Sequence, residues 1–187
     1  MRSFIAINLP QAIKESVDDM TGRLRRHGPP ARWVAGENLH LTMKFLDEIR
    51  DDQVMPLRKA IVSVAEGLDP FQIRLEAFGV FPNERKARIF WVGIGGEIET
   101  LKTLARDIDG AVEPLDFERE QRPFSGHITL ARFREPGPTD RLMRTASDLS
   151  YQSEEICIER IDLMRSVLSG KEPTYSILES IPLRTHN

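Results

Sequence analysis

The chain of 187 residues has little cysteine and no long apolar run, and each shortage excludes a class of protein. Cys157 is the only cysteine, which rules out an intramolecular disulfide framework and a cysteine-rich zinc site. Its apolar neighbours predict a small hydrophobic residue buried in a strand. No segment is long and apolar enough to cross a membrane, and the apolar start of the chain is too short for a signal peptide. We therefore expect a cytoplasmic protein with no membrane partner.

Basic residues are not in excess, since the net charge is −3, and this excludes a generally basic nucleic-acid binder. The basic residues are unusual in kind, however, with 20 arginines against 6 lysines. The planar fork of arginine suits phosphate recognition. Four arginines flank the second of the two motifs described below, at positions Arg119, Arg122, Arg132 and Arg134. This local cluster is a more specific hint of a phosphate than the composition is.

Apolar periodicity predicts a single domain over residues 1–187 that mixes helices with strands, which is the α+β class. Each half of the chain carries similar elements, so we expect a bilobal fold with approximate twofold symmetry. The expected helices cover residues 11–26, 51–66, 98–112 and 139–149. The expected strands cover residues 3–9, 32–34, 39–46, 71–78, 88–94, 124–133, 155–168 and 174–183, with a turn at 169–171 between the last two.

One short phrase occurs twice, as His40-Leu41-Thr42-Met43 and as His127-Ile128-Thr129-Leu130. In a strand, residues two apart share a face, so each phrase presents an imidazole and a hydroxyl on one side and two apolar groups on the other. With 4 His and 9 Thr in the chain, random order gives about 0.2 copies of His-x-Thr. Two copies therefore indicate the halves of one acid–base site.

Such a pair can act without a metal, because one neutral imidazole takes a proton while a second, protonated imidazole gives one. The threonine hydroxyls and an arginine would hold a phosphate between the rings. A metal site wants three or four ligands, and the other histidines, His27 in a turn and His186 in the tail, are not placed to help. No P-loop and no nucleophile elbow is present. We therefore expect no metal and no cofactor.

In these phrases the chain resembles the two-histidine (2H) phosphoesterases. More narrowly, it resembles the bacterial and archaeal RNA 2′,3′-cyclic phosphodiesterases, historically called 2′-5′ RNA ligases. The resemblance spans nearly the whole chain and includes phrases in family order at residues 2–10, 32–34, 37–46, 79–82, 122–132 and 166–175. It implies a pseudo-twofold pair of antiparallel sheets with outer helices and a central cleft. Three departures are Asp47 where glycine is usual, Gly126 where proline is common, and the phrase at 170–173.

The resemblance implies hydrolysis of a terminal 2′,3′-cyclic phosphate on RNA to a 2′-phosphomonoester, and a reverse activity that joins ends through a 2′-5′ bond. It implies that His40 donates the proton to the leaving 3′ oxygen and that His127 is the base acting on water. The near-symmetric motifs by themselves leave the two roles open. Thr42 and Thr129 would bind the phosphate. The expected partner is RNA or a nucleotide with a 2′,3′-cyclic phosphate, and the expected state is a monomer.

Arg132 matches a phosphate-binding arginine of the family, but the phase of a regular strand turns it away from His127. A bulge or strand end after Leu130 would reconcile the two. Three aromatic residues, Trp33, Phe124 and Tyr175, are candidates for stacking on a base. Two other functions stay open, namely a non-catalytic nucleotide- or RNA-binding module and a 2H enzyme for another cyclic or 2′-5′ phosphodiester.

Overall fold

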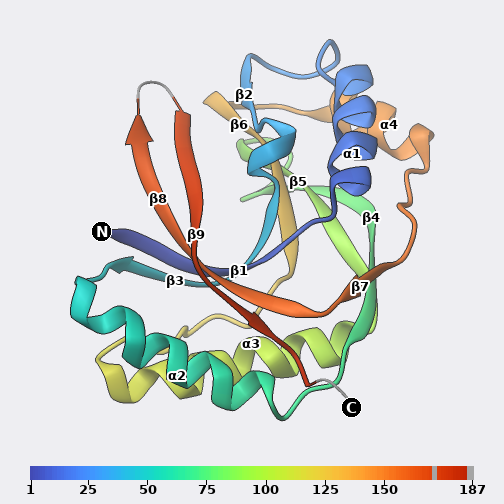
Figure 1. Cartoon of the computed structure of the whole chain (residues 1–187). Coiled ribbons are helices and arrows are strands. Elements are labelled where there is room, and N and C mark those ends of the chain that lie inside the picture. Colours follow the sequence, from blue (N-terminus) through green and yellow to red (C-terminus); the bar gives the residue numbers. More distant parts are fainter. Residues whose placement is uncertain (170–171, 185–187) are drawn as a thin grey trace.

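A computed structural model describes residues 1–169 and 172–184, which form two antiparallel sheets flanked by helices (Figure 1). The first sheet has the order β3-β1-β8-β9 and the second the order β2-β6-β5-β4-β7. The strands are β1 (Arg2–Asn8), β2 (Ala31–Trp33), β3 (His40–Glu48), β4 (Phe71–Phe81), β5 (Ala87–Gly96), β6 (His127–Gly137), β7 (Ile156–Ile158), β8 (Arg160–Ser169) and β9 (Glu172–Pro182). The α-helices are α1 (Gln11–Leu24), α2 (Val54–Ala65), α3 (Ile98–Val112) and α4 (Asp140–Leu149).

The helices lie on the outer sides of the two sheets. Helices α2 and α3 lie side by side under the first sheet, where α2 contacts β8 and β9 and α3 contacts β3 (Figure 1). Helix α4 contacts β4 of the second sheet and α1. Each helix buries one apolar face, as the spacing predicts; in α1 that face is Ile13, Val17, Met20 and Leu24. The α+β prediction with two antiparallel sheets and outer helices is confirmed.

The two sheets do not follow the two halves of the chain. Strand β2 comes from the first half but pairs with β6 in the second sheet, while β8 and β9 come from the end of the chain and complete the first sheet. The predicted single strand over 155–168 is wrong for the same reason. The chain breaks at Glu159, so that β7 pairs with β4 in one sheet and β8 pairs with β1 in the other. An apolar run cannot reveal which sheet each part will join.

The expected burial of Cys157 is not found, and two other expectations concern residues outside the described part of the chain. Cys157 is exposed, so its predicted burial is wrong: Ile156 and Ile158 face inward on β7, and alternation turns the residue between them outward. The turn predicted at 169–171 includes residues 170 and 171, which lie outside the described residues. The tail residue His186 lies outside them as well. Across 1–169 and 172–184, no helix is long and apolar enough to span a membrane.

Candidate active site

The two motifs begin two strands that have the same internal irregularity. His40 is the first residue of β3 and His127 the first residue of β6. In β3, Met43 is an extra residue without a partner in β1, because Ala6 pairs with Thr42 and Ile5 with Lys44. In β6, Leu130 is extra in the same way relative to β5. Each motif therefore ends in a β-bulge at the same position.

The bulge in β6 resolves the phase of Arg132. His127 and Thr129 are half-buried and Ile128 is buried, as the alternation requires. Leu130 and Ala131 are then both buried, so the pattern shifts by one residue and Arg132 is exposed again. We call the side of each sheet that carries its histidine the histidine face. Arg132 lies on the histidine face of the second sheet together with His127 and Thr129, as the resemblance implied.

Both imidazoles are held by the same backbone hydrogen bond. His40 Nδ1 lies 2.7 Å from the carbonyl oxygen of Asn38, and His127 Nδ1 lies 2.8 Å from the carbonyl oxygen of Ser125. A carbonyl oxygen only accepts, so Nδ1 carries the hydrogen in each ring. Nε2 is then the atom left to take or give a proton in each case. The sequence held no signal for these two partners, because the backbone supplies them.

Aromatic side chains surround His40 on the first sheet. Its ring centroid lies 4.8 Å from that of Phe4 and 5.0 Å from that of Tyr175. Burial lowers the pKa of His40, and the charges of Lys14 and Arg132 lower it further, while the hydrogen bond to Asn38 opposes them. Lys14 donates to the carbonyl oxygen of Glu37, at 3.0 Å, and so stands at the turn that leads into His40. Sequence reasoning missed Lys14, because the fold, and not its spacing from His40, brings this residue of α1 to Glu37.

Lys14 provides a test of the electrostatics around His40. In Lys14→Met a charge that lowers the pKa of His40 is removed, so that pKa rises. His40 titrates one limb of the bell-shaped profile of kcat/KM against pH. We expect that limb to move to higher pH in Lys14→Met and to stay in place in Lys59→Met, a change on the exposed side of α2. An unmoved limb in both variants would contradict this account.

Aromatic side chains also surround His127 on the second sheet. Its ring lies edge-on to Phe81, with centroids 5.1 Å apart, and 6.1 Å from the ring of Trp91. The Trp91 ring lies across Gly79, where any Cβ would collide with it. This close approach explains the glycine in the phrase Gly79-Val80-Phe81-Pro82.

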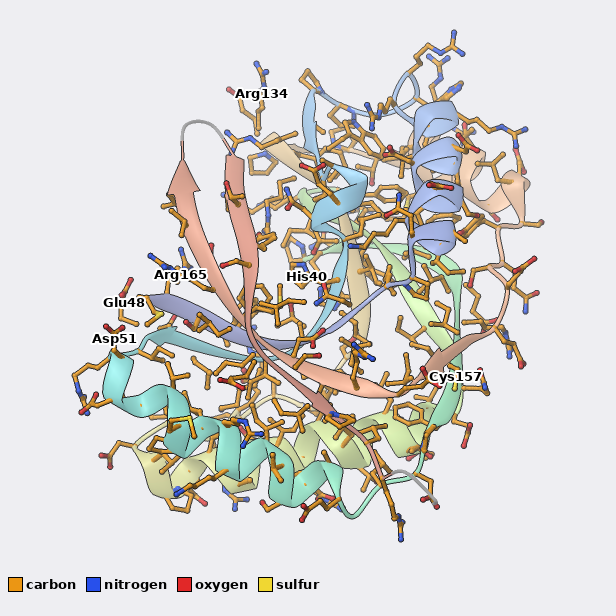
Figure 2. The ribbon with its side chains drawn as sticks, in the orientation of Figure 1. His40, Glu48, Asp51, Arg134, Cys157 and Arg165 are labelled. Atoms are coloured by element: carbon orange, nitrogen blue, oxygen red, sulfur yellow. The ribbon has the colours of Figure 1, made fainter. Side chains whose placement is uncertain are left out.

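The two histidine faces meet through Arg132. Strands β3 and β6 contact each other although they belong to different sheets. The charge of Arg132, from the second sheet, acts on His40 and on Tyr175 of the first. Arg132 of the His127 strand is therefore close enough for its charge to act on the His40 ring, and His40 lies in the centre of the molecule (Figure 2). Thr42 shares the face of His40, since both alternate with the buried Leu41.

The candidate aromatic residues and the flanking arginines differ in what they contact. Of the three aromatic residues, Tyr175 contacts His40. Trp33 instead packs edge-on to the buried Phe90, with Arg25 over its ring, and Phe124 is packed against the core. Of the flanking arginines, Arg119 forms an ion pair with Glu113 at 2.7 Å, and Arg134 is exposed towards the end of β6 (Figure 2).

Two departures from the family pattern have a local explanation. Asp47 has φ of 53°, in the left-handed region, which is why glycine is usual at this position; aspartate is one of the residues that tolerates it. At Gly126 a Cβ would lie 3.2 Å from side-chain carbons of Leu101 and Phe124, so the segment before His127 is tightly packed. The third departure includes residues 170–171, which lie outside the described part of the chain.

A buried ion pair holds in place the segment of the chain that leads to His127. Lys44 Nζ lies 2.5 Å from Asp109 Oδ1 of α3 and donates to the carbonyl oxygen of Glu118, and Asp109 also accepts from the backbone N–H of Glu120. Both charged side chains are largely buried. Because Lys44 belongs to the bulge of β3, the pair ties the first motif strand to the segment that leads to the second.

The described residues form no metal site, and the cavity elsewhere in the fold contains none of the predicted site residues. Among residues 1–169 and 172–184, no group of three or more histidine, cysteine or acidic side chains could hold a metal ion. A cavity of about 700 Å³ lies between β4 and α4, lined by Phe78, Met143 and Tyr151 among others. None of the five predicted site residues lines it.

A family model described as LigT-like phosphoesterase matches the chain twice, over residues 7–91 and 92–175. Each match contains one of the two His-x-Thr phrases, as the twofold prediction requires. The chain belongs to the LigT-like phosphoesterase family.

Several relatives match the chain over nearly all of their length. RNA 2′,3′-cyclic phosphodiesterase of Thermus thermophilus is 33% identical, over 98% of this chain and 91% of the relative. That of Methanothermobacter thermautotrophicus is 27% identical, over 96% and 97%. Among solved structures, TT0787 of Thermus thermophilus superposes with a TM-score of 0.81 at 28% identity over 100% of both chains. Escherichia coli LigT complexed with 3′-AMP superposes with a TM-score of 0.72 at 25% identity over 98% of both chains.

Proposed function

We propose that this protein is an RNA 2′,3′-cyclic phosphodiesterase that hydrolyses a terminal 2′,3′-cyclic phosphate to a 2′-phosphomonoester. The observation that carries the proposal is the matched pair of imidazoles, each with Nδ1 on a backbone carbonyl oxygen and Nε2 left for proton transfer. Full-length relatives bear the name of this activity. Reversal of the reaction would join RNA ends through a 2′-5′ bond, which makes ligation a secondary activity of the same site.

In the proposed reaction His127 Nε2 takes a proton from water, and the water oxygen attacks phosphorus. The bond from phosphorus to the 3′ oxygen breaks, and protonated His40 gives its Nε2 proton to that oxygen. Burial makes protonated His40 a stronger acid, which suits a donor, and the anionic phosphate favours the protonated ring on binding. Thr42, Thr129 and Arg132 bind the non-bridging oxygens, where negative charge is held.

The proposal is tested by adding cytidine 2′,3′-cyclic phosphate to the purified protein in excess EDTA. We expect conversion to the 2′-monophosphate at the same rate with and without the chelator, because no step is assigned to a metal. Binding without turnover would favour the non-catalytic module instead. Faster turnover of a 2′-5′ oligonucleotide or another cyclic phosphate would favour a 2H enzyme for that substrate. The monomeric state, the cytoplasmic location and the single domain stay predictions.

A further inference from the structure

The histidine face of the first sheet continues past the proposed catalytic site as successive rows of paired residues. The first row lies at the end of β1 and the start of β3, where Asn8 pairs with His40. The next row is mainly polar and runs across all four strands through Thr42, Ala6, Asp162 and Ser180. The third row is entirely apolar and consists of Phe45, Phe4, Met164 and Ile177, which we call the apolar row. Paired residues share a face in an antiparallel sheet, so all three rows face the same side.

The apolar row is covered in its middle and open at both ends. Phe4 and Met164 are buried, and Tyr175 packs against them in a cluster separate from the main core. At the two ends, Phe45 is 65% exposed and Ile177 is 53% exposed. Among the described residues, four of the six large exposed hydrophobic side chains belong to this sheet. An exposed apolar group next to a proposed catalytic site marks a binding surface more than chance exposure does.

The bulges give Phe45 a specific counterpart. Each bulge shifts the strand phase in the same way, so Phe45 occupies in β3 the position that Arg132 occupies in β6. One sheet thus brings a cation to the site and the other brings an exposed aromatic ring. Phe45 lies about 13 Å along β3 from His40, at about 3.3 Å per residue and allowing for the bulged residue. That distance is beyond the phosphate itself and falls where an adjoining nucleotide would lie.

Charge favours a nucleic acid over an apolar protein segment as the occupant. The charge of Arg2, next to the apolar row on β1, acts on Tyr175 together with that of Arg132. Glu48, which pairs with Arg2, is engaged by the N-terminal ammonium at 3.0 Å. Aromatic rings flanked by cations are how proteins bind single strands without reading sequence.

We propose that the apolar row is a subsite for the nucleotide on the 5′ side of the cyclic phosphate, with its base stacked on Phe45. The inference rests on the proposed function and adds to it that the preferred substrate is an RNA end and not a mononucleotide. Stacking on one ring is indifferent to base identity, so the subsite distinguishes substrate length and not sequence.

The test compares cytidine 2′,3′-cyclic phosphate with a tetranucleotide that ends in a 2′,3′-cyclic phosphate. We expect a lower KM for the tetranucleotide in the unaltered protein. Phe45→Ala should raise that KM about 5- to 150-fold, the range for loss of one stacked base, and leave the mononucleotide KM within about twofold. Phe45→Trp should restore tight binding of the tetranucleotide. Ile177→Ala should also raise the KM of the tetranucleotide alone.

Met55→Ala is the matched control, because Met55 is 52% exposed on α2, away from this sheet face. Equal KM values for the two substrates, or a Phe45→Ala variant that affects neither or both alike, would overturn the subsite while leaving mononucleotide hydrolysis and the proposed function intact. Failure to hydrolyse either substrate would instead overturn the proposed function. These outcomes separate the two proposals.

Discussion

Hydrolysis of a 2′,3′-cyclic mononucleotide falls about 10²- to 10⁴-fold in His40→Ala and by a similar factor in His127→Ala, because each change removes one proton-transfer group. KM changes much less than kcat, since Thr42, Thr129 and Arg132 still hold the phosphate. The double variant is expected to be little worse than either single variant, because two groups that act on one transition state do not contribute additively.

His27→Ala is the matched control, since His27 lies in the turn after α1, where its backbone N–H bonds to the Leu24 carbonyl oxygen. It should keep full activity. Thermal unfolding of all four variants separates a catalytic loss from a folding loss. Near-normal turnover in either of the two motif variants would refute the two-histidine mechanism.

Lys44→Met lowers the free energy of unfolding by about 3–5 kcal/mol, the range for breaking a buried ion pair, because Asp109 is left charged without its partner. The same change releases the carbonyl oxygen of Glu118 and loosens the segment that leads to His127. We therefore expect kcat to fall as well, although Lys44 lies on the side of β3 opposite His40.

The double variant Lys44→Met with Asp109→Asn tests this mechanism. It leaves no unpaired buried charge and keeps a side-chain oxygen for the Glu120 N–H, so most of the lost stability should return. Urea unfolding provides the measurement, with Lys59→Met as the exposed control. A single-variant cost below about 1 kcal/mol would show that the pair does not hold the segment.

The placement of the two motifs on two strands was predictable from the sequence because the phrase repeats. The two His-x-Thr phrases have period-two spacing in strands, and that spacing alone puts each hydroxyl beside its imidazole. A strand end or a bulge after Leu130 was also expected as a way to reconcile the phase of a regular strand with the phosphate role that the resemblance implies for Arg132. The matching bulge at Met43, and with it the exposure of Phe45, did not follow, since no residue after Met43 had an expected role that raised the question of its phase.

Other features depend on contacts that a sequence does not display. The backbone carbonyl oxygens of Asn38 and Ser125 that fix both rings carry no side-chain signature. The charge of Lys14 acts on His40 because of how the segment 25–39 between α1 and β3 folds, and not because of spacing in the sequence. The separation of β7 from β8 depends on which strand offers a free edge, so a continuous apolar pattern over 155–168 concealed it.

In the proposed mechanism both imidazoles contact one phosphate. A crystal structure with a bound 2′-nucleotide product tests that contact directly. We expect His40 Nε2 and His127 Nε2 each within about 2.6–3.2 Å of oxygens on the same phosphate, with Thr42, Thr129 and Arg132 on the remaining oxygens. A phosphate that contacts only one of the two rings, or that binds elsewhere on the protein, would contradict the account.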